Sequence, residues 1–164
     1  MYELWGGGAP FEVVGDGTKS LRDRAGTKVN LLGISGSILH NLRYDEEWKD
    51  TKTAWVSKTD EPRWAMECLQ KFRSTPGKEP IGSLIDSVQI YKGSKQDHFR
   101  QLKSEFPNIA FEDMIFFDNE YGNIQTVSKL GVCCIYCPDG VTQEIWEQGL
   151  DQFATGCKSR DKGL

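Results

Sequence analysis

Short apolar segments alternate with amphipathic helical segments along most of this chain, and that order limits the folds open to it. The apolar runs have the length of buried strands and lie at 53–56, 87–91, 114–117 and 132–137. Between and after them, apolar residues recur at helical spacing, as Phe99, Leu102 and Phe106 do. Strands that alternate with helices predict an α/β three-layer sandwich, in which a mostly parallel, Rossmann-like sheet is covered on both faces.

The first part of the chain has a different pattern. Glycine-rich turns, including the one at 15–17, separate short apolar runs near 11–14 and 28–32, which is typical of a small hairpin. We expect a small cap insertion at about residues 6–32 within a single domain spanning 1–154. The segment 155–164 has almost no apolar residue, which predicts a flexible tail.

Composition narrows the class of protein and its partners. The 164 residues, 38% hydrophobic and 27% charged, suit one soluble domain. The net charge of -4 provides no basic surface for nucleic acid, and no apolar run approaches membrane-spanning length. Met1 leads into no secretory signal, so we expect a cytoplasmic location, without nucleic-acid or membrane partners. The five cysteines, odd in number and mostly in apolar stretches, predict reduced thiols.

Polar clusters follow three of the predicted strands, at the point where each strand ends. They lie at 57–59 (Ser-Lys-Thr), 93–95 (Gly-Ser-Lys) and 118–120 (Asp-Asn-Glu). In open α/β sheets, ligands bind outside the carboxyl ends of the strands. Taken singly, a hydroxyl or carboxylate there can cap the next helix, and a lysine can be a solvated surface charge. Together, the clusters supply the groups that hold a phosphoryl group and a hard divalent ion.

The order of these clusters resembles the last three motifs of the haloacid-dehalogenase superfamily. The closest branch is the magnesium-dependent phosphatases, described as acid or protein-tyrosine phosphatases, and the resemblance covers about residues 1–150. It rests on Ser-Lys-Thr at 57–59, Gly-Ser-Lys-x-x-His-Phe at 93–99, Phe-Phe-Asp-Asn-Glu-x-x-Asn at 116–123, and Trp-Gly-Gly-Gly-Ala-Pro-Phe at 5–11. It implies a haloacid-dehalogenase-type sheet with a small cap.

The resemblance also implies which residues bind phosphate. Ser57 would hydrogen-bond the transferring phosphoryl group, and Lys95 would neutralise the phosphate and the nucleophile, so these two are the candidate catalytic residues. Lys58 and Thr59 complete the candidate phosphate-binding set with them.

A metal site is implied at the third cluster. Asp118 would ligate Mg2+, and Asn119 and Glu120 would support it through hydrogen bonds or water. Asn119 stands where many relatives have a second Asp, which weakens the expected site without abolishing it.

The first motif of the superfamily has no match in this sequence. In the family, an apolar strand ends in Asp-x-Asp, which provides the nucleophile and the acid–base group. Residues 1–5 contain neither aspartate, and at Val14-Gly15-Asp16 a valine occupies the nucleophile position. We therefore expect an N-terminally incomplete (truncated) copy that lacks the central first strand and is inactive as written.

Three functions fit these observations. The leading hypothesis is a Mg2+-dependent phosphomonoester hydrolase acting through a phosphoaspartate on a phosphopeptide or a small phosphorylated metabolite. The alternative is a non-catalytic module that binds phosphate or a phosphoprotein. A flavodoxin-like receiver or nucleotide-binding domain is disfavoured, because no G-x-G-x-x-G follows a strand and 93–95 lacks the spacing of a P-loop.

Overall fold

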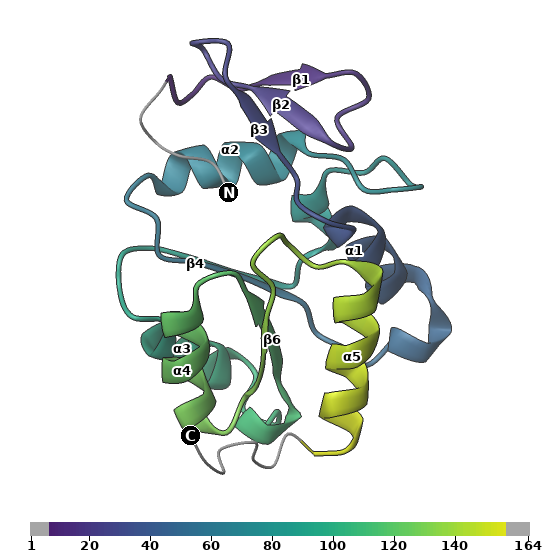
Figure 1. Cartoon of the computed structure of the whole chain (residues 1–164), viewed down its shortest axis with the longest axis vertical. Helices are drawn as coiled ribbons and strands as arrows, with labels where there is room; N and C mark the ends of the chain where they lie inside the picture. Colours follow the sequence, from purple (N-terminus) through teal and green to yellow (C-terminus); the bar gives the residue numbers. More distant parts are fainter. Residues whose placement is uncertain (1–6, 157–164) are drawn as a thin grey trace. The chain divides into compact units, whose positions relative to one another are not determined.

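The computed structural model describes residues 7–156 of the chain (Figure 1). The chain divides into two compact units, an N-terminal unit (Met1–Lys92) and a C-terminal unit (Gly93–Leu164), and each is described by itself. The expectation of a single domain over 1–154 stays a prediction. Residues 1–6 of the N-terminal motif and 157–164 of the expected tail lie outside the described residues.

The N-terminal unit begins with a small antiparallel sheet in the order β1 (Glu12–Val14), β2 (Ser20–Arg22) and β3 (Lys28–Asn30). Its register places Leu21 between Val13 and Val29. The outer strands lie in the stretch where the sequence predicted a small hairpin. The middle strand β2 was not predicted, because Leu21 is its only apolar residue.

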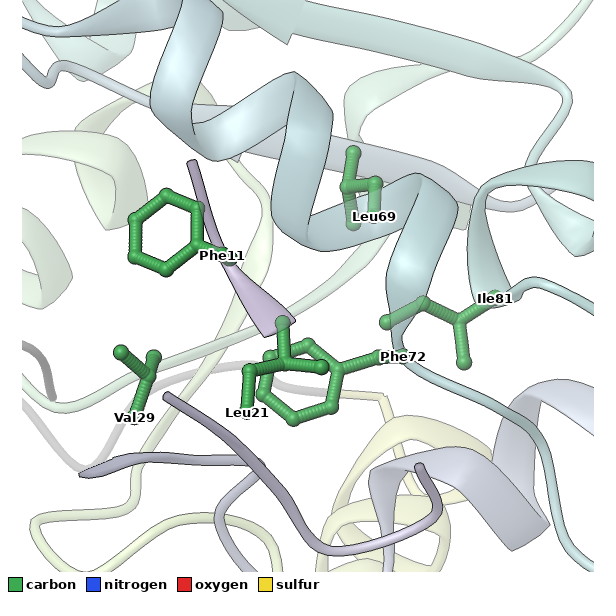
Figure 2. Close-up of a cluster of buried hydrophobic side chains, with 6 residues drawn as sticks. All are labelled: Phe11, Leu21, Val29, Leu69, Phe72 and Ile81. Carbon is green, nitrogen blue, oxygen red and sulfur yellow. The ribbon is translucent and has the colours of Figure 1, made fainter. Parts of the chain in front are cut away.

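The small sheet packs on helix α2 (Pro62–Lys71) through a shared hydrophobic core. Figure 2 shows side chains from the sheet and the segment before it lying against side chains from α2 and the residues after it. Burial of an aliphatic or aromatic side chain of this size stabilises a fold by about 1.5–3 kcal/mol. The cluster therefore attaches the small sheet firmly to the unit. Its buried members are Phe11, Leu21, Val29, Leu69, Phe72 and Ile81.

A parallel strand pair forms the other part of the N-terminal unit. The strands β4 (Ala54–Ser57) and β5 (Ser87–Ile90) pair in register from Ala54 and Ser87 onward. Thr53 and Asp86 tie the starts of the two strands together, because the Thr53 amide donates to the Asp86 carboxylate at 2.9 Å. The remaining helices of this unit are α1 (Ser35–Tyr44), η1 (Glu46–Trp48) and η2 (Ile81–Leu84).

The C-terminal unit is a second parallel pair with helices on both faces. Its strands are β6 (Ile115–Asp118) and β7 (Cys133–Tyr136). Phe116 packs against Phe99 on one face, and Phe117 packs against Trp146 on the other. The helices are α3 (Lys95–Glu105), η3 (Phe111–Asp113), α4 (Tyr121–Val127), η4 (Ser128–Leu130) and α5 (Gln143–Ala154).

These observations confirm a mixed α/β protein with parallel strand pairs. A single three-layer sheet that contains all four parallel strands stays a prediction, because β4–β5 and β6–β7 are separate two-stranded sheets in different units. The absence of a central strand likewise stays a prediction.

The starts of α2 and α3 differ in how they are capped. The cap position of α2 is Glu61, which makes no side-chain cap bond, and the preceding residue Asp60 pairs with Lys92 at 3.2 Å. Lys95 lies on the first turn of α3, because the Ser94 hydroxyl accepts a hydrogen bond from the Asp97 amide and starts the helix there.

The cysteines follow the expectation with one exception. Cys68, Cys134 and Cys137 are free thiols, whereas Cys133 is disulfide-bonded, so the expectation of reduced thiols was wrong for Cys133. Within residues 7–156, no helix has both the length and the apolar character needed to cross a membrane.

Candidate phosphate and metal site

The candidate site in the C-terminal unit is built around Asp118, the last residue of β6. Its Oδ2 lies 3.3 Å from the Nζ of Lys95, and only 9% of the Asp118 side chain and 6% of the Lys95 side chain are exposed. Two opposite charges this far from water stabilise each other, and removal of one leaves the other buried without compensation. The structure thus brings together two residues that the sequence placed in separate clusters.

Hydrogen bonds from nearby amides orient the Asp118 carboxylate. The Glu120 backbone amide donates to Oδ1 at 2.7 Å, and the Asn123 side-chain amide donates to both oxygens at 3.1 Å. Asn123 is buried on α4 and also reaches the Glu120 carboxylate, at 3.4 Å. Asn123 therefore orients both acidic groups. The sequence placed it in a motif, but we assigned it no role.

Lys95 is held from two directions. Its Nζ lies 5.5 Å from the centre of the Phe116 ring, which favours a cation above the ring face. Its backbone is fixed by the first turn of α3, where buried His98 donates from Nδ1 to the Ser94 carbonyl at 2.6 Å. His98 is thus a structural support for the lysine, and the proton lies on Nδ1 because a carbonyl oxygen only accepts.

The oxygens around Asp118 fit Mg2+. Two carboxylates, Asp118 and Glu120, share the Asn123 amide and are the hard oxygen donors that this ion prefers. No group of three or more His, Cys, Asp or Glu side chains that could hold a metal is found in the described part of the chain. Mg2+ commonly keeps several waters and takes one or two carboxylates, so it needs no larger group. Asn119 makes no side-chain hydrogen bond within residues 7–156.

The other predicted phosphate ligands belong to the N-terminal unit. Ser57 ends β4, and its carbonyl accepts from the Tyr91 amide at 3.1 Å. Lys58 is exposed, and the Thr59 hydroxyl accepts from the Glu61 amide at 3.1 Å. Their role in phosphate binding stays a prediction, since they lie in a different unit from Lys95 and Asp118.

Two thiols near Asp118 are poor nucleophiles. Burial, and to a smaller extent the negative charge of Asp118, raise the pKa of Cys134 to about 12. The same two causes raise the pKa of Cys137 to about 11. Both thiols are therefore protonated at neutral pH, and neither provides the thiolate that covalent catalysis needs.

Comparison with known proteins places the chain in a family. The model of the acid phosphatase family matches residues 1–156. Magnesium-dependent phosphatase 1 of Homo sapiens is 36% identical over 145 residues, which cover 88% of this chain and 74% of that protein. An HAD-like hydrolase superfamily protein of Schizosaccharomyces pombe is 29% identical over 126 residues, 76% of this chain and 70% of that protein. The chain therefore belongs to the acid phosphatase family, within the haloacid-dehalogenase superfamily.

Proposed function

We propose that this chain is the phosphate- and metal-binding body of a Mg2+-dependent phosphomonoester hydrolase. The observation that carries the proposal is the buried Lys95–Asp118 pair at the carboxyl end of β6, in a chain that the acid phosphatase family matches over 1–156. The name of the human relative, which refers to magnesium, and the oxygen donors around Asp118 support Mg2+ as the cofactor.

Each residue of the site has a defined task in this proposal. Asp118 holds Mg2+, and Asn123 and Glu120 keep its carboxylate in place. Mg2+, when bound, neutralises and orients the phosphoryl group. Lys95 offsets the repulsion between a phosphate dianion and an approaching anionic nucleophile. Ser57 donates a hydrogen bond to the phosphoryl oxygens.

The nucleophile that the family uses, the first aspartate of Asp-x-Asp, is missing from these 164 residues. No Asp-x-Asp occurs anywhere in the sequence. We propose that hydrolysis through a phosphoaspartate needs this motif at the end of a further apolar strand, as the resemblance implies. Without that strand, the 164 residues bind phosphate esters and do not hydrolyse them. The substrate is a phosphopeptide or a small phosphorylated metabolite, including a tyrosine phosphoester.

The test compares the 164-residue chain with a version extended at its N-terminus by an apolar strand that ends in Asp-x-Asp. We expect Mg2+-dependent release of p-nitrophenol from p-nitrophenyl phosphate by the extended protein only. Asp118→Ala in the extended protein should abolish that release, because the metal loses its carboxylate. Hydrolysis by the 164-residue chain, or by the extended Asp118→Ala variant, would contradict the proposal.

Metal binding gives a second readout that does not depend on turnover. In calorimetric titrations with Mg2+, the 164-residue chain should bind the ion and its Asp118→Ala variant should not. Asp113→Ala is the matched control, because Asp113 is an exposed carboxylate of η3 in the same unit. Equal Mg2+ binding by the chain and its Asp118→Ala variant would mean that Asp118 is not a ligand of Mg2+.

A further inference from the structure

Two exposed tyrosine rings lie together in the C-terminal unit. Tyr121 is 59% exposed and Tyr136 is 45% exposed. Their ring centres are 5.6 Å apart at an interplanar angle of 82°, an edge-to-face contact. Among the described residues of this unit, they are the only large hydrophobic side chains that are exposed. Single exposed aromatics are ordinary on protein surfaces, whereas a pair of them in contact forms an apolar patch.

The backbone places this pair next to the Asp118 carboxylate. Tyr136 is the register partner of Asp118 across β6 and β7, and such partners in a parallel sheet present their side chains on the same face, with strands about 4.8 Å apart. Tyr121 is the first residue of α4 and follows Glu120. Both rings therefore lie beside the proposed metal ligand.

Lys95 lies on that same face of the strand pair. Its Nζ contacts the ring of Phe116, whose side chain shares a face with Asp118 because the two are separated by two positions along β6. An anion held by Lys95 and an Asp118-bound metal thus has an aromatic surface as its neighbour.

We propose that Tyr121 and Tyr136 form a platform for a flat ring on the organic side of the phosphoester, and so are specificity-determining residues. The inference rests on the proposed phosphate and metal site. Two tyrosines in edge-to-face contact offer a ring face and a ring edge, which is how aromatic groups pack on one another. The charged neighbours Asp118 and Glu120 are acidic, so an uncharged ring fits this surface better than a second anionic group.

The platform predicts a preference that binding measurements detect. With the 164-residue chain in Mg2+, phenyl phosphate should bind about ten-fold more tightly than ethyl phosphate, the size expected from one or two aromatic contacts. Dissociation constants for these two esters and for inorganic phosphate are measured by calorimetry. Tyr136→Ala should make the two esters bind about equally while affinity for inorganic phosphate is unchanged.

Two control variants test whether the preference comes from the aromatic ring of Tyr136. One removes only its hydroxyl group, and the other removes an exposed tyrosine elsewhere. Tyr136→Phe keeps the ring and should keep the preference for phenyl phosphate. Tyr44→Ala removes an exposed tyrosine of α1 in the N-terminal unit and should leave all three constants unchanged. Unchanged binding of inorganic phosphate by Tyr136→Ala also shows that this variant is folded.

The outcomes distinguish the platform from the site on which it rests. If inorganic phosphate binds but phenyl phosphate has no advantage over ethyl phosphate, the platform is wrong and the proposed function stands. A preference that survives in the Tyr121→Ala, Tyr136→Ala double variant also overturns the platform. If no phosphate compound binds, the proposed function is wrong, and the platform falls with it.

Discussion

Two buried carboxylates, one in each unit, have different partners. Asp23, which lies between β2 and β3 in the N-terminal unit and is 3% exposed, accepts hydrogen bonds from the backbone amides of Gly7, Ala25 and Thr27 at 2.7–3.0 Å. Asp118 in the C-terminal unit also accepts a backbone amide, but its other partners are the side chains of Lys95 and Asn123.

The difference distinguishes a carboxylate with a structural role from the proposed metal ligand. The oxygens of Asp23 are used by amides of its own turn and of the segment before the sheet, so they hold the chain in shape. Asp118 is at the end of a parallel strand, where ligands bind, and faces a cation that a phosphate can share. The two carboxylates are similarly buried, and what differs between them is the identity of their partners.

The largest expected effect is on the stability of the N-terminal unit. Asp23→Ala leaves three backbone amides without their acceptor, and we expect the free energy of unfolding to fall by about 3 kcal/mol. Urea denaturation measures it. Asp16→Ala is the matched control: this exposed carboxylate accepts hydrogen bonds from Thr18 and pairs with Lys78 at the surface, so its loss should cost much less than the loss of Asp23. Similar losses for both variants would contradict the structural role of Asp23.

The second effect is on function in the C-terminal unit. Lys95→Met in the version extended by an Asp-x-Asp strand should lower p-nitrophenyl phosphate turnover about 100-fold, the usual size of a lost electrostatic donor. Because Asp118 then loses its cation, this variant should also be less stable, so rates are compared at a temperature where circular dichroism shows it folded. Lys129→Met, at an exposed lysine of η4, is the control. A near wild-type rate would mean that Lys95 serves only to neutralise Asp118.

The smallest effect concerns the hydrogen bonds by which Glu67 and Lys71 of α2 hold the backbone of Phe11. The Phe11 amide donates to Glu67 at 2.8 Å, and Lys71 donates to the Phe11 carbonyl and pairs with Glu67 at 2.9 Å. Burial raises the pKa of Glu67, but the hydrogen bonds from Lys71 and Phe11 more than offset it and hold the pKa below its ordinary value of 4.5.

A carboxyl group with a lowered pKa stabilises the fold above its unfolded pKa, and the stabilisation is lost as the pH falls through the folded value. Glu67→Gln should therefore cost about 1–2 kcal/mol at pH 7 and less as the pH falls below about 4.5. Urea denaturation at several pH values measures it, with Glu46→Gln, at an exposed ion pair with Lys49, as the control. A cost for Glu67→Gln that stays constant down to pH 3 would contradict a stabilising role for the ionised Glu67 carboxylate.

Several features of the site could be predicted from the sequence alone. Asp118 follows an apolar run, and its place at the end of a strand could be expected from that pattern. The helical spacing of Phe99, Leu102 and Phe106 indicated a helix here, but only the structure shows that Ser94 caps it and that Lys95 lies on its first turn. Asp60, just before α2, pairs with Lys92, and the cap position of that helix is Glu61. Local patterns indicate that a helix begins nearby, but the competing partner of each side chain decides where.

Other features depended on contacts between distant residues. Asp23 gave no sequence signal, because the amide of Gly7 reaches it only after the chain has folded back. The tyrosine pair combines residues 15 positions apart, which are brought together by the register of β6 and β7. The disulfide of Cys133 was likewise not legible from an odd set of cysteines in apolar stretches.

The sequence by itself determined the order of strands and helices, the family, and the residue types at the strand ends, because hydrophobic periodicity and motif spacing are properties of neighbouring residues. Only the tertiary structure decided that Lys95 and Asp118 form a buried pair, that Asn123 orients the carboxylate, and that two tyrosines lie beside it. These are relations between residues of different elements, and packing and strand register, not local preference, set the distances between them.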